Sequence, residues 1–194
     1  AQLGRNAWAL FSRVFLQLPD IFFNSIPAFG PLYHVSIPFV LIGIIVFTIR
    51  LFKEKQIEKQ TQMLALWGFL ITGIWVGLIT FEVNINRVNI IFYPVILLCA
   101  YGISLVVDKF GKLFPVIVAA YAVSSVLFFA TYFTEYAEES RYYYNKDFLD
   151  AVAEADSMEE YASLYITGNL GWQFNQLATE ILTQYACRID ARYY

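Results

Sequence analysis

Apolar residues gather in four long runs, at residues 35–51, 63–81, 90–107 and 113–133. Arg50 is the only charged residue in the first run, and the other three contain none. A hydrocarbon core about 30 Å thick is crossed by about 17–25 helical residues. Because lipid offers no partners to backbone polar groups, the runs predict four transmembrane helices forming a domain at 35–133. Buried helices of a soluble protein are the alternative, which four successive long runs with a single charged residue among them disfavour.

Residues 1–34 precede these runs, and their aromatic residues follow helical spacing at Trp8, Phe11 and Phe15. The helical run that contains these aromatic residues is too short to cross a membrane. It is either an amphipathic helix lying in the outer interface or the tail of an earlier span. Prolines and Gly30 then interrupt the chain and predict a rigid, aromatic-rich outer loop at 26–33. We therefore expect residues 1–34 to form an extracytoplasmic loop with an interfacial helix.

The pattern changes after residue 133. Residues 147–161 suit a helix, residues 162–167 alternate as a short strand, and residues 172–185 suit a second helix. The sequence thus predicts a small extracytoplasmic α/β segment at 134–194. We expect it to be truncated, because about sixty residues bury little core.

Charge divides the chain at the same place. Residues 1–133 carry nine Lys/Arg and five Asp/Glu (net +4), whereas residues 134–194 carry four and eleven (net −7). The chain is 59% hydrophobic and only 15% charged, unlike a soluble domain. The acidic balance gives no reason to expect a nucleic acid partner, and membrane lipid is the expected surroundings.

Basic residues near the span ends predict the orientation in the membrane. Residues 50–59 carry four Lys/Arg and residues 108–112 carry two, against three at the opposite ends. Because basic loops favour the cytoplasm, both chain ends and the 82–89 loop are expected outside a multi-pass protein of the cell membrane.

The sequence contains no nucleotide-binding or hydrolase motif and no paired cysteine motif. Its single histidine, His34, cannot build a metal site alone. Cys99 lies inside an apolar run and Cys187 near the end, so a disulfide between them is not assumed. We expect no metal and no cofactor.

A polar cluster at one membrane rim is the best candidate for chemistry. Arg87 lies among Asn84, Asn86 and Asn89, just before the third span and Tyr93. A guanidinium offers a planar fork of donors suited to phosphate, so the cluster could hold a lipid phosphate while the lipid tail stays in the bilayer. The alternatives are an arginine that anchors a helix end, or an interfacial ion pair with Glu82. Tyr33 and His34 complete the predicted substrate-binding set.

Residues 84–102, NINRVNIIFYPVILLCAYG, resemble a late span of the bacterial polytopic glycosyltransferases of family 39. These enzymes have the GT-C fold and are similar to the protein O-mannosyltransferases. They carry an arginine a few residues before a span with an early proline and a later glycine. Residues 26–33, IPAFGPLY, before a span, and a short outer tail also resemble that family.

The resemblance implies transfer of a sugar from a polyprenyl-phosphate donor to an acceptor at the outer face. It covers only the C-terminal half of such an enzyme, whose base is an acidic residue in the first outer loop. Asp20 and Glu82 are the outer carboxylates ahead of the tail, and neither lies in that acidic motif. We therefore expect a fragment with part of the donor site, no catalytic residue, and no activity without its N-terminal half.

Two other functions compete with this interpretation. A non-enzymatic membrane subunit could bind a partner through its acidic tail. A transporter or flippase would often show polar residues or breaks deep inside its spans, whereas these span interiors are apolar apart from Ser and Thr.

Overall fold

The computed structural model describes residues 2–26, 28–158, 166 and 176–188. The chain divides into two compact units, Ala1–Thr131 and Tyr132–Tyr194, which are described separately below. Within the described residues, every regular element is a helix.

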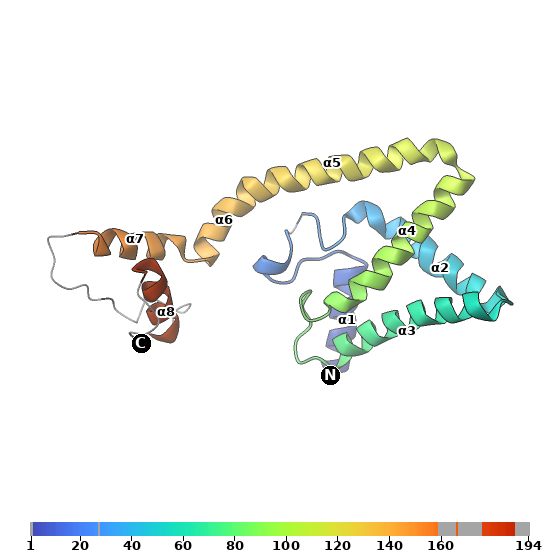
Figure 1. Cartoon of the computed structure of the whole chain (residues 1–194), viewed down its shortest axis with the longest axis horizontal. Helices are drawn as coiled ribbons and strands as arrows, with labels where there is room; N and C mark the ends of the chain where they lie inside the picture. Colours follow the sequence, from blue (N-terminus) through green and yellow to red (C-terminus); the bar gives the residue numbers. More distant parts are fainter. Residues whose placement is uncertain (1, 27, 159–165, 167–175, 189–194) are drawn as a thin grey trace. The chain divides into compact units, whose positions relative to one another are not determined.

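The first unit contains five α-helices (Figure 1). They are α1 (Gln2–Val14), α2 (Ile37–Lys53), α3 (Ile57–Ile79), α4 (Phe92–Lys109) and α5 (Phe114–Phe133). Short 3-10 turns are η1 (Phe22–Asn24), η2 (His34–Ser36), η3 (Asn89–Ile91) and η4 (Gly111–Leu113). Together with the turns that precede α2, α4 and α5, four of these helices are long and apolar enough to cross a membrane. The four predicted spans are thereby confirmed as helices of sufficient length and hydropathy to cross a membrane.

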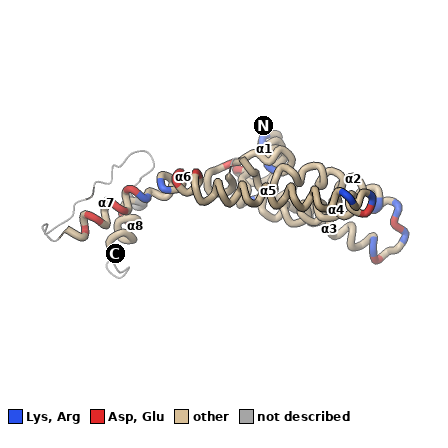
Figure 2. The backbone as a smooth tube through the Cα atoms, turned by 90° about the horizontal axis from the view of Figure 1, so that it is seen from above, with Lys and Arg blue, Asp and Glu red and all other residues tan. Residues whose placement is uncertain are grey.

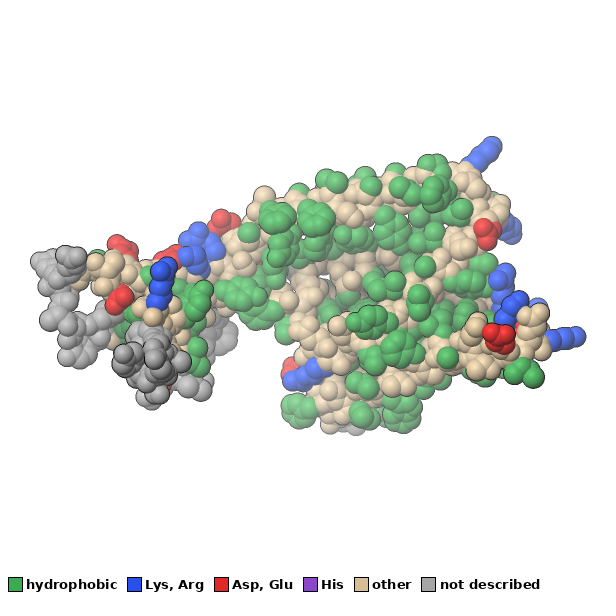
Figure 3. All heavy atoms as spheres, viewed as in Figure 1, with side chains coloured by type: hydrophobic (Ala, Val, Ile, Leu, Met, Phe, Trp, Pro, Cys, Tyr) green, Lys and Arg blue, Asp and Glu red, His purple; other side chains and the backbone are tan. Residues whose placement is uncertain are grey.

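Helix α3 starts six residues earlier than the apolar run at 63–81, at Ile57 instead of residue 63. Residues 58–62 are polar but are mostly good helix formers, and Glu58 lies in the first turn, where a negative charge suits the helix dipole. The connection between α2 and α3 is therefore short. Figure 3 shows hydrophobic side chains covering the helices of this unit, with charged groups gathered at the helix ends.

Helices α2 and α4 form the closest pair in the first unit. Gly43 of α2 and Gly102 of α4 let the two backbones meet, since a Cβ on Gly102 would lie 2.0 Å from the carbonyl oxygen of Phe39. Gly73 and Gly77 of α3, which lie four residues apart in a GxxxG spacing, are both buried. They face Ile91 and Leu10 respectively, so this spacing serves packing.

Helix α1 buries a different face from its aromatic one. Leu10 and Val14 join the core, and Asn6 is also buried, whereas Trp8 and Phe11 are exposed. The Asn6 side chain donates hydrogen bonds to the carbonyl oxygens of Leu78 and Thr80, at 2.9 and 2.8 Å. It thereby caps carbonyls that the end of α3 leaves without helical partners.

The second unit contains α6 (Glu135–Tyr143), α7 (Lys146–Asp156) and α8 (Gln176–Ala186). Helices α7 and α8 lie within the two helices predicted for the tail, apart from one residue at an end of each, whereas α6 is an addition. The predicted strand at 162–167 lies, except for Ile166, outside the described residues. Figure 2 shows charges of both signs along α6 and α7, while α5 carries none.

Candidate functional site

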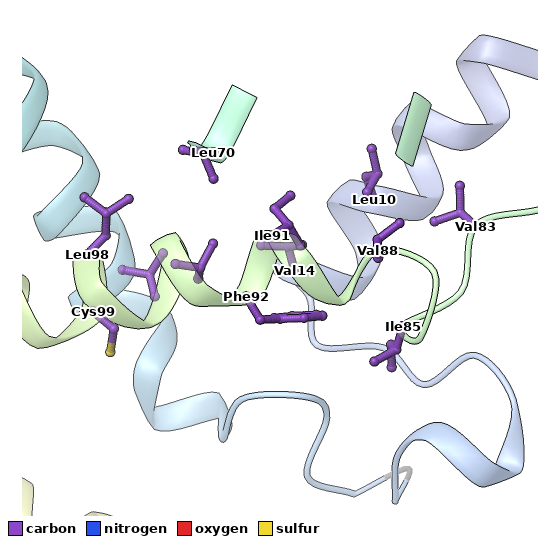
Figure 4. Close-up of a cluster of buried hydrophobic side chains, with 12 residues drawn as sticks. Leu10, Val14, Leu70, Val83, Ile85, Val88, Ile91, Phe92, Leu98 and Cys99 are labelled. Atoms are coloured by element: carbon purple, nitrogen blue, oxygen red, sulfur yellow. The ribbon is translucent and has the colours of Figure 1, made fainter. Parts of the chain in front are cut away.

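The 82–89 loop is anchored by its own apolar residues. Val83, Ile85 and Val88 are buried in the main core cluster, and Val88 is completely enclosed. Figure 4 shows Val83 and Val88 on the side of the loop near Leu10 of α1, with Ile85 at the bend of the loop. All three belong to the same buried cluster as Leu10 and Val14. Alternating apolar and polar residues thus turn the polar members of the loop outward, and Arg87 is among them.

The Arg87 side chain is half-exposed and held by the loop itself. Its Nη1 donates a hydrogen bond to the carbonyl oxygen of Glu82 at 3.0 Å and lies 3.8 Å from the Glu82 carboxylate. Its backbone N–H donates to the Asn84 side-chain oxygen at 3.0 Å, which closes the turn. The ion pair between Arg87 and Glu82, one alternative raised by the sequence, is therefore present.

The buried carboxylate of Asp20 also holds the 82–89 loop in place. The Asp20 side chain is 2% exposed, and its Oδ2 accepts a hydrogen bond from the backbone N–H of Ile85. The same oxygen lies 3.8 Å from Nε of Arg13, and the Asn24 side chain donates to both carboxylate oxygens at 3.2 Å. Asp20 thus joins the segment after α1 to the loop that carries Arg87. The sequence alone indicates only that Asp20 is an outer carboxylate outside the family's acidic motif.

The other predicted site residues do not form one cluster with Arg87. Asn86 and Asn89 are exposed, and Asn84 is partly buried in the turn. Tyr93 stacks on Phe69 of α3, with ring centroids 6.4 Å apart. His34 is exposed at the start of η2. Among the described residues, no group of three His, Cys, Asp or Glu side chains could hold a metal ion.

Tyr33 lines a cavity of about 570 Å³ between the 26–33 loop, α4 and α5. The wall is mainly apolar, with Ile96 and Phe128 among its members. Polar groups converge at one point, where the hydroxyls of Ser36 and Tyr121 lie 2.8 Å apart. The Cys99 thiol lies 3.5 Å from the same Tyr121 oxygen. The cavity therefore suits an apolar ligand that carries one hydrogen-bonding group.

Comparisons with protein families, with curated proteins and with solved structures find no match to this chain. The likeness of residues 84–102 to the family 39 glycosyltransferases therefore depends on the sequence motif alone. The structure adds the position of each residue in that motif. Four of the described helices are long and apolar enough to cross a membrane, and Arg87 pairs with Glu82 in the loop between α3 and α4.

Proposed function

We propose that this chain is the donor-binding, C-terminal part of a membrane glycosyltransferase. The enzyme would move a sugar from a polyprenyl-phosphate donor to an acceptor on the outer face of the cell membrane. The base would lie in the N-terminal half of the enzyme, as the family resemblance implies. The observation that carries the proposal is the half-exposed Arg87 guanidinium, held by Glu82 in the loop that joins α3 to α4. This loop is the predicted outer rim of the two spans.

The depth of Arg87 suits a phosphate whose isoprenoid tail lies in the hydrocarbon. Its present partner can be displaced, because an exposed ion pair such as that with Glu82 contributes only about 0–1 kcal/mol. A hydrogen bond to a charged phosphate contributes about 1.5–3 kcal/mol, and a guanidinium can make two in parallel. The balance favours the phosphate. While no sugar donor is bound, Glu82 would keep the Arg87 side chain extended.

The cavity beside Tyr33 offers room for the apolar part of such a donor. Ile96, one of its lining residues, lies one turn into α4, about 6 Å along the axis from Phe92. At that depth the chain of a rim-bound lipid enters the hydrocarbon. The mainly apolar wall of the cavity beside Tyr33 is compatible with an isoprenoid chain.

The alternative function is a membrane subunit that binds a partner through its acidic tail. Residues 132–194 form a separate compact unit, and residues 134–194 carry eleven acidic and four basic residues. A basic partner surface would complement this charge. This function needs no donor site, so the two proposals differ in their dependence on Arg87.

The deciding experiment measures sugar transfer against donor concentration in the intact protein that contains this chain. We expect Arg87→Ala to weaken donor use by about 10–150-fold, because each 1.4 kcal/mol corresponds to about a factor of ten. Arg87→Lys should recover part of it, since it keeps the charge and loses the fork. Arg5→Ala is the matched control, because Arg5 is an exposed arginine of α1. Near-normal transfer by Arg87→Ala at normal expression would show that Arg87 is only an anchor.

A further inference from the structure

Basic side chains line a second cavity, at the end of the α2–α3 hairpin. This cavity measures about 590 Å³, and its wall includes Arg50, Lys53 and Lys59. Glu54 is the acidic residue in the wall, so the lining carries a net charge of +2 by side-chain count. Figure 3 shows the charged side chains crowded at this end of the first unit. An anion is the complementary ligand.

Two of the charged groups in the wall have fixed positions. The Arg50 guanidinium carbon lies 5.5 Å from the ring centroid of Tyr101 in α4, and Phe47 packs edge-on against the same ring. Stacking on an aromatic face restrains the guanidinium before any ligand arrives. The Glu54 carboxylate accepts hydrogen bonds from the backbone N–H groups of Lys55 and Gln56, both at 2.9 Å. These bonds tie Glu54 to the hairpin turn, where its carboxylate also interacts electrostatically with Lys59.

The basic cavity adjoins an apolar one. A cavity of about 780 Å³ shares Phe47, Gln62 and Met63 with it and continues between α3 and α4 as far as Thr72 and Leu97. From Gln62 to Thr72 the helix rises about 15 Å, which is half of a hydrocarbon core. The molecule thus offers a cationic pocket at a membrane surface and an apolar groove running from it into the membrane.

We propose that this combined site binds one anionic phospholipid. The headgroup phosphate would lie against Arg50, Lys53 and Lys59, and an acyl chain would follow the groove beside Met63 and Thr72. Basic pockets between transmembrane helices on the cytoplasmic side suit anionic headgroups, and the basic loops predict that side for this hairpin. The proposal does not depend on the glycosyltransferase function, because Arg87 and the cavity beside Tyr33 form no part of the site.

The test uses the full chain purified in detergent, with binding followed by native mass spectrometry. The probes are phosphatidylglycerol and phosphatidylcholine with identical acyl chains. The double variant Arg50→Gln/Lys59→Gln is compared with Lys109→Gln/Lys112→Gln. The control pair removes the same charge at the α4–α5 connection, where Lys109 lies over the Phe110 ring and outside the cavity.

We expect the protein to prefer phosphatidylglycerol, and the pocket variant to lose about tenfold in affinity or more, as expected for one lost charged hydrogen bond. The control variant should lose only about twofold, the order expected of a screened charge outside the site. Equal binding of the two lipids, or equal losses in both variants, would overturn the proposal.

Two further measurements establish that the occupant is a lipid. Ala65→Phe places a ring in the apolar groove without changing any charge, since Ala65 lines only that cavity of the two. It should weaken phosphatidylglycerol binding, and unchanged binding would refute the acyl-chain part of the proposal.

Inorganic phosphate at the same concentration should not compete, because it has no chain to bury. Equal competition by phosphate would identify a simple anion site and overturn the lipid assignment. The comparison of lipids in the unmodified protein remains decisive if a variant fails to fold.

Discussion

The Asp20 carboxylate accepts a hydrogen bond from the backbone N–H of Ile85, sixty-five residues further along the chain. The contact is buried and shares its oxygen with the Arg13 guanidinium, which lies 3.8 Å away. It connects the segment that follows α1 to the loop that presents Arg87. The position of the candidate phosphate ligand therefore depends on a side chain with no direct part in binding.

Replacing Asp20 by Ala should destabilise the first unit by about 3–5 kcal/mol. The change leaves the Arg13 charge without its partner in a largely buried place, and a broken buried pair costs about that much. The backbone N–H of Ile85 also loses its acceptor and should exchange its hydrogen faster. Thermal unfolding in detergent and hydrogen exchange at Ile85 measure the two effects.

Glu82→Gln is the matched control for this change. Glu82 belongs to the same loop, but its carboxylate is 72% exposed and pairs only with the half-exposed Arg87. Exposed pairs contribute about 0–1 kcal/mol, so the control should unfold close to the unmodified protein. If the two variants unfolded at the same temperature, Asp20 would not fasten the loop.

Features of the fold that depend on neighbouring residues can be predicted from the sequence, whereas contacts between distant segments cannot. The four spans follow from nearly uncharged apolar runs of membrane length, which is a local property. The start of α3 does not follow from the apolar run, because the helix formers after Ile57 are polar and lie outside that run. The contact between Asp20 and Ile85 joins distant segments, and no local pattern indicates it.

The candidate site shows the same limit. Arg87 and its pair with Glu82 lie within one short loop and were foreseen as alternatives from the sequence. The burial of Val83, Ile85 and Val88 has a local signal in the sequence, namely apolar residues that alternate with polar ones. The convergence of Ser36, Cys99 and Tyr121 brings three separate helical segments together and had no local signal.

Alkylation of Cys187 should show a pH dependence shifted upward from that of an ordinary thiol. Burial and then the charge and hydrogen bond of Asp156 raise the pKa of Cys187. A raised pKa leaves less thiolate at a given pH, so maleimide should react more slowly than with a free cysteine. In Asp156→Asn the pKa should fall part of the way back and the rate should rise severalfold.

The control for the thiol measurement is Asp150→Asn. Asp150 lies on the same helix, α7, and pairs with Lys146. Its loss should leave the midpoint of the Cys187 pH–rate profile in place. The measurement is made in a Cys99→Ala background, which removes the buried second thiol. An equal shift in both variants would mean that Asp156 has no specific influence on Cys187.

Single cysteines at Gln56 and Ser157 should be labelled from opposite sides of intact cells. Gln56 lies in the short connection between α2 and α3, and Ser157 follows α7, so three candidate spans separate the two positions. The six basic residues of the 50–59 and 108–112 segments predict that Gln56 faces the cytoplasm. An impermeant maleimide should therefore label position 157 alone until the membrane is opened. Labelling of both positions in sealed cells would refute this topology.

The contact between Gly43 and Gly102 should make Gly102→Ala more damaging than Gly77→Ala or Gly68→Ala. A Cβ at position 102 would lie 2.0 Å from the carbonyl oxygen of Phe39, and one at position 43 would lie 1.9 Å from that of Leu98. Both obstacles are backbone atoms, so α2 and α4 would have to separate. Overpacking costs about 1–3 kcal/mol even where side chains can adjust, and here the cost should reach at least the upper part of that range.

Two other glycines of the same unit provide a graded comparison. In Gly77→Ala the new methyl group meets the end of the Leu10 side chain at 2.5 Å, which can move, so the loss should be smaller. Gly68→Ala meets nothing within 4 Å and replaces a poor helix former by a good one, so stability should hold or rise by up to about 1 kcal/mol. Unfolding temperatures in one detergent should therefore fall in the order Gly68→Ala, Gly77→Ala, Gly102→Ala. A Gly102→Ala protein as stable as the Gly68→Ala protein would show that α2 and α4 do not pack at backbone contact.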